Sequence, residues 1–243
     1  MIYTYALTDP SGIKFVAVQR NKRRCVERVS NKTLSSISRR SYYQSSGIND
    51  DADEQPASLV PSLLVANRQI YQEGCDILYG NELVFADTVA LYAFMINLGP
   101  AGGASHLRKM RLKDWGCGRT SKAYNNACFA VLIQATNLEK LYIDTTNGWY
   151  RMPKNIAQQI YRDAFPWLEA VGHARGKFDA ALDVLELSDE SLGRDYYGSK
   201  GTSGAQRRKM FNDELSRNLG LQQKRVTAKS VKRRKVSKVS EES

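Results

Sequence analysis

The side chains best suited to metal binding in this chain are its four cysteines and two histidines. The cysteines are Cys25, Cys75, Cys117 and Cys128. They lie 50, 42 and 11 residues apart, without any Cys-x-x-Cys pair, and His106 and His173 stand apart from them and from each other. Because a zinc site needs ligands close enough to close a tetrahedron, the spacing predicts no metal site and favours free thiols.

Acid–base and nucleophilic groups show no catalytic spacing either. His106 precedes an apolar, strand-like segment and Asp114 follows it, so that a base and a carboxylate flank one element. The sequence contains no Gly-x-Ser-x-Gly elbow, and the glycine-rich stretch 198–204 lacks the Gly-Lys-Ser/Thr ending of a phosphate-binding loop. We therefore expect a protein without enzymatic activity and without a cofactor.

Lysine and arginine clusters are the strongest charged feature of the chain. Residues 200–243 carry a net charge of +9 and residues 1–40 one of +7, whereas residues 41–199 carry −5. A compact basic cluster in an extended segment suits an acidic importin groove, or phosphates through counterion release. We expect nuclear import first, with nonspecific nucleic-acid binding and a solubilising tail as alternatives. The predicted import cluster is Lys224, Arg225, Lys232, Arg233, Arg234 and Lys235.

Three segments of the middle region share one spacing of apolar residues, Leu-x-x-apolar-x-apolar. They begin at Leu107, Leu138 and Leu182, so successive segments start 31 and 44 residues apart. Each follows a helix-like stretch, and such intervals leave room for the crossover helix that parallel strands need. The pattern predicts an α/β (α+β) fold, a degenerate leucine-rich-repeat-like stack of helices and short parallel strands. An ordinary mixed α+β domain is the alternative, since a regular leucine-rich repeat recurs every ~20–29 residues.

Composition divides the chain into four parts. Residues 1–18 end in a short alternating strand that follows the turn signal Asp9-Pro10-Ser11-Gly12. Residues 19–56 are polar and have too little apolar surface to offset their ordering entropy, which predicts a loop or a disordered insertion. Residues 57–192 form the predicted helix/strand domain. Residues 193–243 are expected to form a flexible linker, a short helix and a basic disordered tail.

Capping signals and helical periodicity mark the helices of the central domain. Pro61 suits a first helical turn, Gly80-Asn81 a helix end, and Asp87 and Thr88 an N-cap. A short strand is expected at 83–85. The predicted helices span 61–79, 89–98, 121–135 and 155–165, with a further helical turn over 166–171.

One part of the chain resembles a known family. It runs Leu63-Leu64-Val65-Ala66-Asn67-Arg68-Gln69-Ile70-Tyr71-Gln72-Glu73 and continues with Ile77-Leu78-Tyr79-Gly80-Asn81 and Val84-Phe85. It is similar to the L-L-x-x-C-R-Q-I-Y-x-E-x-x-x-x-L-Y-x-x-N-x-F motif of a fungal group of uncharacterised F-box-like proteins, with Asn67 at the usual cysteine. The opening Met1-Ile2-Tyr3-Thr4-Tyr5-Ala6-Leu7 resembles the end of the group's first motif, whose P-x-E-I-R-N half is missing, so that this motif is truncated. The motif residues expected to be structural are Leu64, Arg68, Gln69, Ile70, Tyr71, Glu73, Leu78, Tyr79, Asn81 and Phe85.

The resemblance implies a protein that binds other proteins. An F-box implies docking to the Skp-type linker of a cullin ubiquitin ligase, with the helix/strand stack holding a substrate. With the basic tail, this leads us to expect a nuclear F-box-like substrate adaptor, with the cytoplasm as the alternative location. The rival hypothesis is a chromatin-associated protein that binds nucleic acid nonspecifically through basic termini. No stretch approaches the ~20 apolar residues needed to cross a bilayer, so we expect no membrane partner.

Overall fold

A six-stranded sheet forms the centre of the computed structural model. The model describes residues 2–40, 56, 58–98, 103–115, 119–144, 152–192 and 203–241. The strands are β1 (Ile13–Arg20), β2 (Arg23–Val29), β3 (Glu82–Asp87), β4 (Lys109–Asp114), β5 (Lys140–Ile143) and β6 (Leu185–Leu187). Their order is β2-β1-β3-β4-β5-β6, and only the β1–β2 pair is antiparallel. The predicted mixed α/β fold with parallel strands is therefore confirmed.

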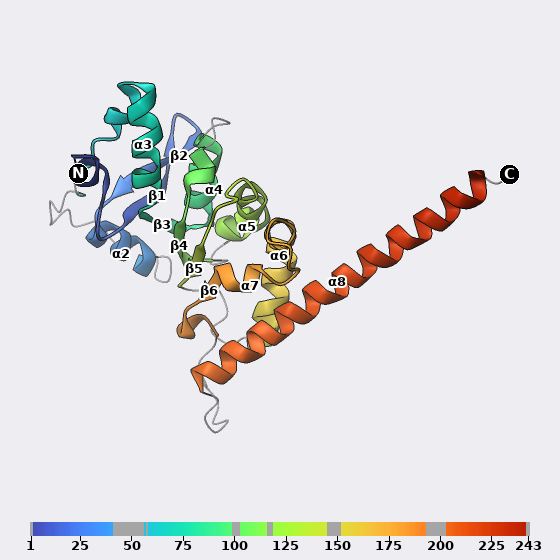
Figure 1. Cartoon of the computed structure of the whole chain (residues 1–243). Helices are drawn as coiled ribbons and strands as arrows, with labels where there is room; N and C mark the ends of the chain where they lie inside the picture. Colours follow the sequence, from blue (N-terminus) through green and yellow to red (C-terminus); the bar gives the residue numbers. More distant parts are fainter. Residues whose placement is uncertain are drawn as a thin grey trace.

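Helices connect the strands. They are α1 (Ile2–Leu7), α2 (Asn31–Arg40), η1 (Pro61–Val65), α3 (Arg68–Tyr79), α4 (Thr88–Asn97), η2 (Gly103–His106), α5 (Arg119–Leu132), α6 (Pro153–Ala174), α7 (Ala181–Val184), η3 (Asp189–Leu192) and α8 (Gly204–Glu241). The helices α3, α4, α5, α6 and α8 gather on one face of the sheet, where their side chains join the strands in one continuous core (Figure 1). Since β3 to β6 are neighbours in chain order, the chain winds in one direction, as in repeat stacks.

The three segments with matching apolar spacing lie in register across the sheet. Met110, Leu141 and Leu185 are register partners on β4, β5 and β6, and all three are buried beneath the helices. The residues two positions further along each strand form a second buried row. That row is Leu112, Ile143 and Leu187. Because alternate residues of a strand share a face, the apolar spacing that the three segments share produces two buried rows of side chains on one face of the sheet.

The prediction of a loop or disordered insertion over residues 19–56 is wrong for its first half. β1 continues to Arg20, and β2 and α2 follow it. Asn21 and Lys22 both have positive φ, 49° and 65°, which gives the two-residue turn that suits a twisted hairpin. Lys22 is not a typical residue for this turn. On the edge strand β2, Arg23 and Arg24 are exposed, whereas Arg28 is half-buried and lies 3.0 Å from Asp9 Oδ2. Residues 41–55 lie outside the described ranges.

Three predicted elements have different bounds in the structure. The helix expected over 61–79 is split into η1 and α3, because Asn67 is extended and its side chain accepts a hydrogen bond from the Ile70 N–H at 2.8 Å. The helix expected to pause at Pro166 instead runs through it in α6, since the buried Trp167 and Leu168 hold its second half on the core. The third segment begins in α7, and its strand starts only at Leu185.

The C-terminal helix is longer than the short helix predicted there. α8 packs on α6 through Phe211, Leu215 and Leu219, which share one helical face and are buried. Its second half leaves the body (Figure 1). The backbone of the predicted tail is helical up to Glu241, although no side chain is described after Arg225. The predicted linker at 193–202 lies outside the described residues.

Candidate interaction surfaces

The face of the sheet opposite the main helices carries the residues that stand between the apolar positions. Arg111 separates Met110 from Leu112, and its register partner on β5 is Tyr142, which is paired in turn with Glu186 on β6. Over β1 and β3 this face is covered by α2, whose Leu34 joins a small apolar cluster. Over β4 to β6, the described part of the chain leaves the face half-exposed.

We call the polar side chains of this face the strand-face row. Its members come from four neighbouring strands or from the residue directly after one of them. They are Glu82, Lys109, Arg111, Lys113, Lys140, Tyr142, Asp144 and Glu186. Three are acidic and four are basic, so carboxylates and cations are mixed along the row and its net charge is +1. Such a mixture favours a partner with a matching charge pattern over a uniformly charged one.

Arg111 is the centre of the strand-face row. Its Nε donates to Glu82 Oε1 at 2.7 Å and its Nη1 to Asp144 Oδ1 at 2.8 Å, while its guanidinium lies 4.6 Å from the centre of the Tyr142 ring. Burial alone would lower the pKa of Arg111, but the hydrogen bonds and charges of Glu82 and Asp144 outweigh it and raise that pKa. The guanidinium is thus held permanently charged in one orientation.

The rest of the strand-face row is tied together by ion pairs. Lys113 Nζ donates to Asp144 Oδ2 at 2.8 Å, and Lys140 Nζ lies 3.6 Å from Glu186 Oε2. The Asp144 carbonyl also accepts a hydrogen bond from Ser191 Oγ at 2.9 Å, which anchors the segment after β6 to the end of β5. The arrangement is a rigid, mixed-charge surface rather than a set of independent long side chains.

A polar hollow of about 340 Å³ lies at the α2 end of the strand-face row. Its lining includes Lys14, Arg111 and Lys113. The three ammonium donors of Lys14 go to Ser11 O, Ser11 Oγ and Gly12 O, at 2.7–2.8 Å. Lys14 therefore stabilises the turn before β1, and the hollow is best described as an extension of the strand-face row.

The two segments that carry the family resemblance, residues 1–7 and 63–85, lie in contact with each other. α1 packs against α3, and the fully buried Leu7 lies at their contact. The Asn81 side chain connects them, since its Oδ1 accepts from the Asp9 N–H at 2.8 Å and its Nδ2 donates to the Leu7 and Leu78 carbonyls at 2.8 and 2.7 Å. Asn81 thus satisfies backbone groups that the end of α1 and the end of α3 leave open.

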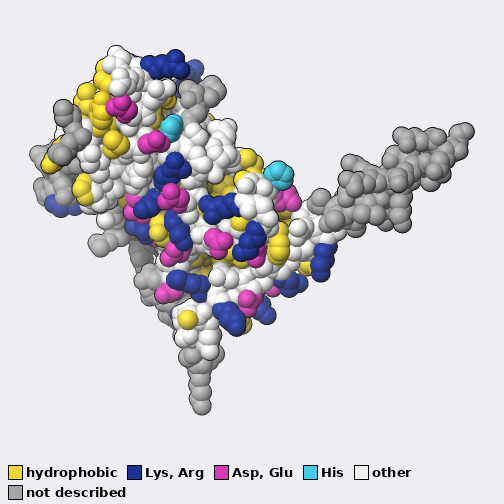
Figure 2. Space-filling view, in the orientation of Figure 1, with side chains coloured by type: hydrophobic (Ala, Val, Ile, Leu, Met, Phe, Trp, Pro, Cys, Tyr) yellow, Lys and Arg dark blue, Asp and Glu magenta, His cyan; other side chains and the backbone are white. Residues whose placement is uncertain are grey.

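Large apolar side chains stand exposed around these two segments. We call Tyr5, Val60, Val65 and Tyr71 the N-terminal patch; Tyr5 is 83% and Val65 85% exposed. Figure 2 shows apolar side chains gathered at the upper left, over the region of α1, η1 and α3. Uncovered apolar surface of this kind is typical of protein-binding sites.

The polar motif residues of α3 lie on its exposed side. Gln69 Nε2 donates to Glu73 Oε1 at 2.8 Å. Arg68 was expected to be structural, yet it is exposed and forms no hydrogen bond or ion pair with another described residue. Its guanidinium is therefore available beside the N-terminal patch. Of the remaining motif side chains, Leu78 and Phe85 belong to the core, and Leu64 and Tyr79 pack against it.

The residues considered for catalysis do not converge. His106 Nδ1 lies 2.7 Å from Asp76 Oδ1, whereas Asp114 is at the opposite end of β4. Burial raises the pKa of Cys75 and of the fully buried Cys128, which keeps both thiols protonated. Cys117 lies outside the described residues. Over the described ranges, no group of three or more His, Cys, Asp or Glu is placed to hold a metal ion.

The predicted import cluster is distributed along the second half of α8. Lys224 and Arg225 are exposed. The other four residues lie on helical backbone, rather than on the extended segment that the sequence suggested. As far as the structure describes them, none of the helices is long and apolar enough to span a membrane.

Comparisons with known proteins assign neither a family nor a function to this chain. The chain matches no protein-family model, no curated protein and no solved structure. Three features were not predicted from the sequence: the pairing of Arg111, the exposure of Arg68 and the length of α8. The shared strand face of Arg111 could have been predicted, because Arg111, Tyr142 and Glu186 occupy the same position between the apolar residues of each repeated segment.

Proposed function

We propose that this protein is a non-enzymatic interaction protein that binds a partner protein on the open face of its sheet. The observation that carries the proposal is the strand-face row, which is half-exposed, carries both acidic and basic side chains and is held rigid by the ion pairs of Arg111 and Asp144. A surface with its side chains already ordered loses little conformational entropy when a partner binds. The hydrophobic core on the opposite face of the sheet holds the strands that carry these side chains in place.

We further propose that the protein acts as a nuclear F-box-like substrate adaptor. The resemblance of residues 63–85 to the fungal F-box-like group supports this role. The N-terminal patch offers apolar surface where a Skp-type ligase linker would dock, and the exposed Arg68 lies beside it. The strand-face row would then hold the substrate at a distance from the linker.

The basic half of α8 supports nuclear import as the route to that location. Lys224 and Arg225 are exposed and free to meet an acidic importin surface. The same charges favour the second candidate function, nonspecific nucleic-acid binding, because a basic helix releases counterions from a phosphate backbone. The two functions differ in which part of the molecule they require.

Affinity purification with charge-reversed variants tests the proposal. Arg111→Glu would place a third carboxylate beside Glu82 and Asp144, so we expect the co-purifying proteins to be lost. Arg20→Glu is the matched control, because Arg20 is also an ion-paired arginine of the sheet but lies at the end of β1, outside the strand-face row. An unchanged set of partners with Arg111→Glu would refute the strand-face row as the binding surface.

The same purification separates the adaptor from its alternative. Recovery of a Skp-type linker that depends on Val65 and Arg68 would support the adaptor. Recovery of nucleic acid that survives Arg111→Glu and disappears when residues 222–243 are deleted would favour the nucleic-acid function instead. Nuclear enrichment is expected to be lost on that deletion under both functions.

A further inference from the structure

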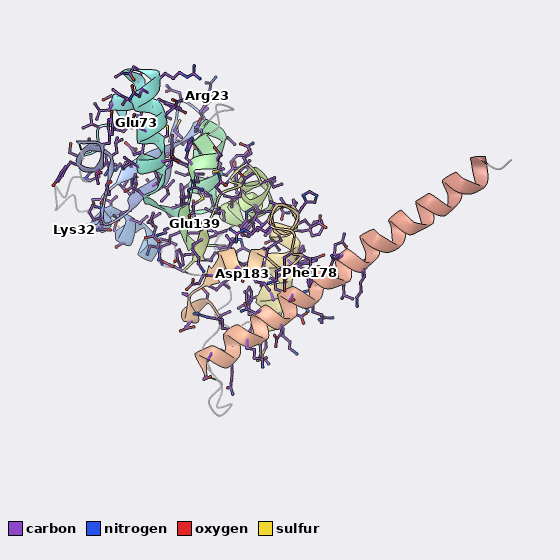
Figure 3. All side chains as sticks on the ribbon, viewed as in Figure 1. Arg23, Lys32, Glu73, Glu139, Phe178 and Asp183 are labelled. Carbon is purple, nitrogen blue, oxygen red and sulfur yellow. The ribbon has the colours of Figure 1, made fainter. Side chains whose placement is uncertain are left out.

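A second hollow lies on the other side of the molecule from the strand-face row, between α6 and α8. Its volume is about 670 Å³, which is in the range of ligand and peptide sites. We call it the α6–α8 groove and define it by Phe165, Ala170, His173, Phe178, Leu219 and Gln223. Phe178 is labelled beside α8, close to where that helix leaves the body (Figure 3).

The groove has the shape and floor of a helix-binding site. Its two long walls are helices, and the α6 wall runs from Phe165 to His173, about 12 Å at 1.5 Å per residue. Two turns of an amphipathic helix, with anchors at i, i+4 and i+7, match that length. Phe178 on the floor is 39% exposed and Leu221, further along α8, is 42% exposed. These are apolar side chains that the folded chain leaves uncovered.

The groove opens where the apolar seam between α8 and α6 ends. The apolar seam of α8 ends with Leu219, and the positions one turn further on are Gln222 and Gln223. Gly220 lies against the Phe178 ring, and a Cβ there would be 3.6 Å from that ring. A partner helix would therefore extend the apolar contact with α6 that α8 no longer makes beyond Leu219.

The rim on the α8 side is strongly basic. Residues 217–240 contain nine Lys and Arg and no Asp or Glu. Arg217 is paired with Glu214, but Lys224 and Arg225 are exposed and form no ion pair with another described residue. On the α6 side, Glu169 and His173 are exposed, and the lining residue Lys177 lies 3.3 and 3.8 Å from carboxylate oxygens of Asp179 and Asp183. The positive charge of Lys177 is therefore already compensated, whereas that of Lys224 and Arg225 is not compensated by any described residue.

Tyr161 of α6 connects the charge of α8 with the groove. Its ring makes a T-shaped contact with the ring of Phe165, a groove residue, with centroids 5.5 Å apart. The pKa of Tyr161 is raised by burial and by the carboxylate of Glu169, and the charge of Arg225 acts in the opposite direction. Arg225 therefore acts electrostatically on a side chain that contacts the groove.

We propose that the α6–α8 groove binds an acidic amphipathic helix of a partner protein. The apolar face of that helix would cover Phe165, Phe178 and Leu219, and its carboxylates would meet Lys224 and Arg225, which follow the groove residue Gln223 on α8. A phosphate backbone gains nothing from an apolar floor, which makes nucleic acid a poorer fit. A second copy of this chain is also a poorer fit, because its own α8 carries the same positive charge.

Fluorescence anisotropy with the full-length protein tests the proposal. The probe is a labelled helical peptide of about four turns with Leu and Phe on one face and Glu on its flanks; the comparison probes are the same peptide with Lys for Glu, and a DNA duplex. We expect the Glu peptide to bind at least tenfold more tightly than the Lys peptide. Ala170→Glu, which places a charge in the groove, is expected to weaken Glu-peptide binding about tenfold.

Charge reversal on α8 supplies the matched control. Lys224→Glu is expected to weaken the Glu peptide about fivefold, whereas Lys209→Glu changes the net charge equally on the same helix but away from the groove, and is expected to have little effect. Equal losses for the two variants would reduce the effect to net charge and refute the groove. Tighter binding of the duplex, unaffected by Ala170→Glu, would also refute it. Circular dichroism melts confirm that each variant is folded.

Discussion

At the scale of single residues, the structure depends on a few polar side chains that satisfy buried backbone groups. Asn81 forms hydrogen bonds to Asp9 and Leu7, which are 72 and 74 residues away in sequence, and to Leu78, which is one helical turn away. On the open face of the sheet, Arg111 joins β3 to the end of β5 through the side-chain carboxylates of Glu82 and Asp144. Each of these side chains connects segments that are far apart in sequence.

Replacing Asn81 by Ala is expected to destabilise the fold by about 2–3 kcal/mol, because the Asp9 N–H and the Leu7 carbonyl lose their partners inside the protein. Urea denaturation measures the loss. Asn97→Ala is the control, since Asn97 is exposed and donates to the Ala93 carbonyl, which α4 already bonds. Equal losses for the two variants would mean that burial of the Asn81 network is unimportant.

At the scale of elements, α8 is held on α6 by an apolar seam and one buried carboxylate. Glu214 accepts from Arg217 Nε and Nη2 at 3.0 and 2.6 Å and from Gln158 Nε2 at 3.0 Å. The hydrogen bonds from Arg217 and Gln158 lower the pKa of Glu214 from 4.5 to about 2. Because the folded-state pKa is depressed, its contribution to stability is present above pH 4.5 and is lost as the pH falls toward 2.

Glu214→Gln is accordingly expected to cost about 1–2 kcal/mol at pH 7, a figure reduced for solvent screening of the exposed Arg217. The difference from the unsubstituted protein should shrink as the pH is lowered through 4 to 3. Chemical denaturation at several pH values measures this trend. Asp213→Asn, on the exposed side of the same helix, is the control and should show a smaller loss at pH 7.

At the scale of the whole molecule, winding the chain in one direction puts α3 to α6 on one face of the sheet, while α2 covers only β1 and β3 on the other and leaves β4 to β6 available there. The core therefore needs the first half of α8 to complete its helical layer, while the second half extends away from it (Figure 1). The strand-face row, the N-terminal patch and the α6–α8 groove lie on different sides of this single body. One molecule can hold several partners without their competing for space.

Two deletions test this division of α8. Removing residues 222–243 takes away no buried side chain among those described, so the melting temperature is expected to change by less than about 4 °C. Removing residues 204–243 uncovers the seam of Phe211, Leu215 and Leu219 and is expected to cost about 5 kcal/mol or more. Differential scanning calorimetry compares the two, and equal melting temperatures would contradict the docking of α8.

The sequence alone was sufficient for features set by local spacing. The apolar positions of β4, β5 and β6, the parallel direction implied by their separation and the Asp87 cap of α4 all follow from periods of two or 3.6 residues and from short-range hydrogen bonds. The composition also identified the basic C-terminal region. Whether the chain is an adaptor or binds nucleic acid stays a prediction, as does its nuclear location.

Only the tertiary structure decided what depends on distant partners. Arg111 meets residues 29 and 33 positions away, and α6 tolerates Pro166 because the core holds Trp167 beyond it. The hairpin at Asn21-Lys22 forms because β1 gives β2 a partner, which outweighs its polar composition. In each case the free energy comes from contacts between segments, and a local pattern carries no information about which segments will meet.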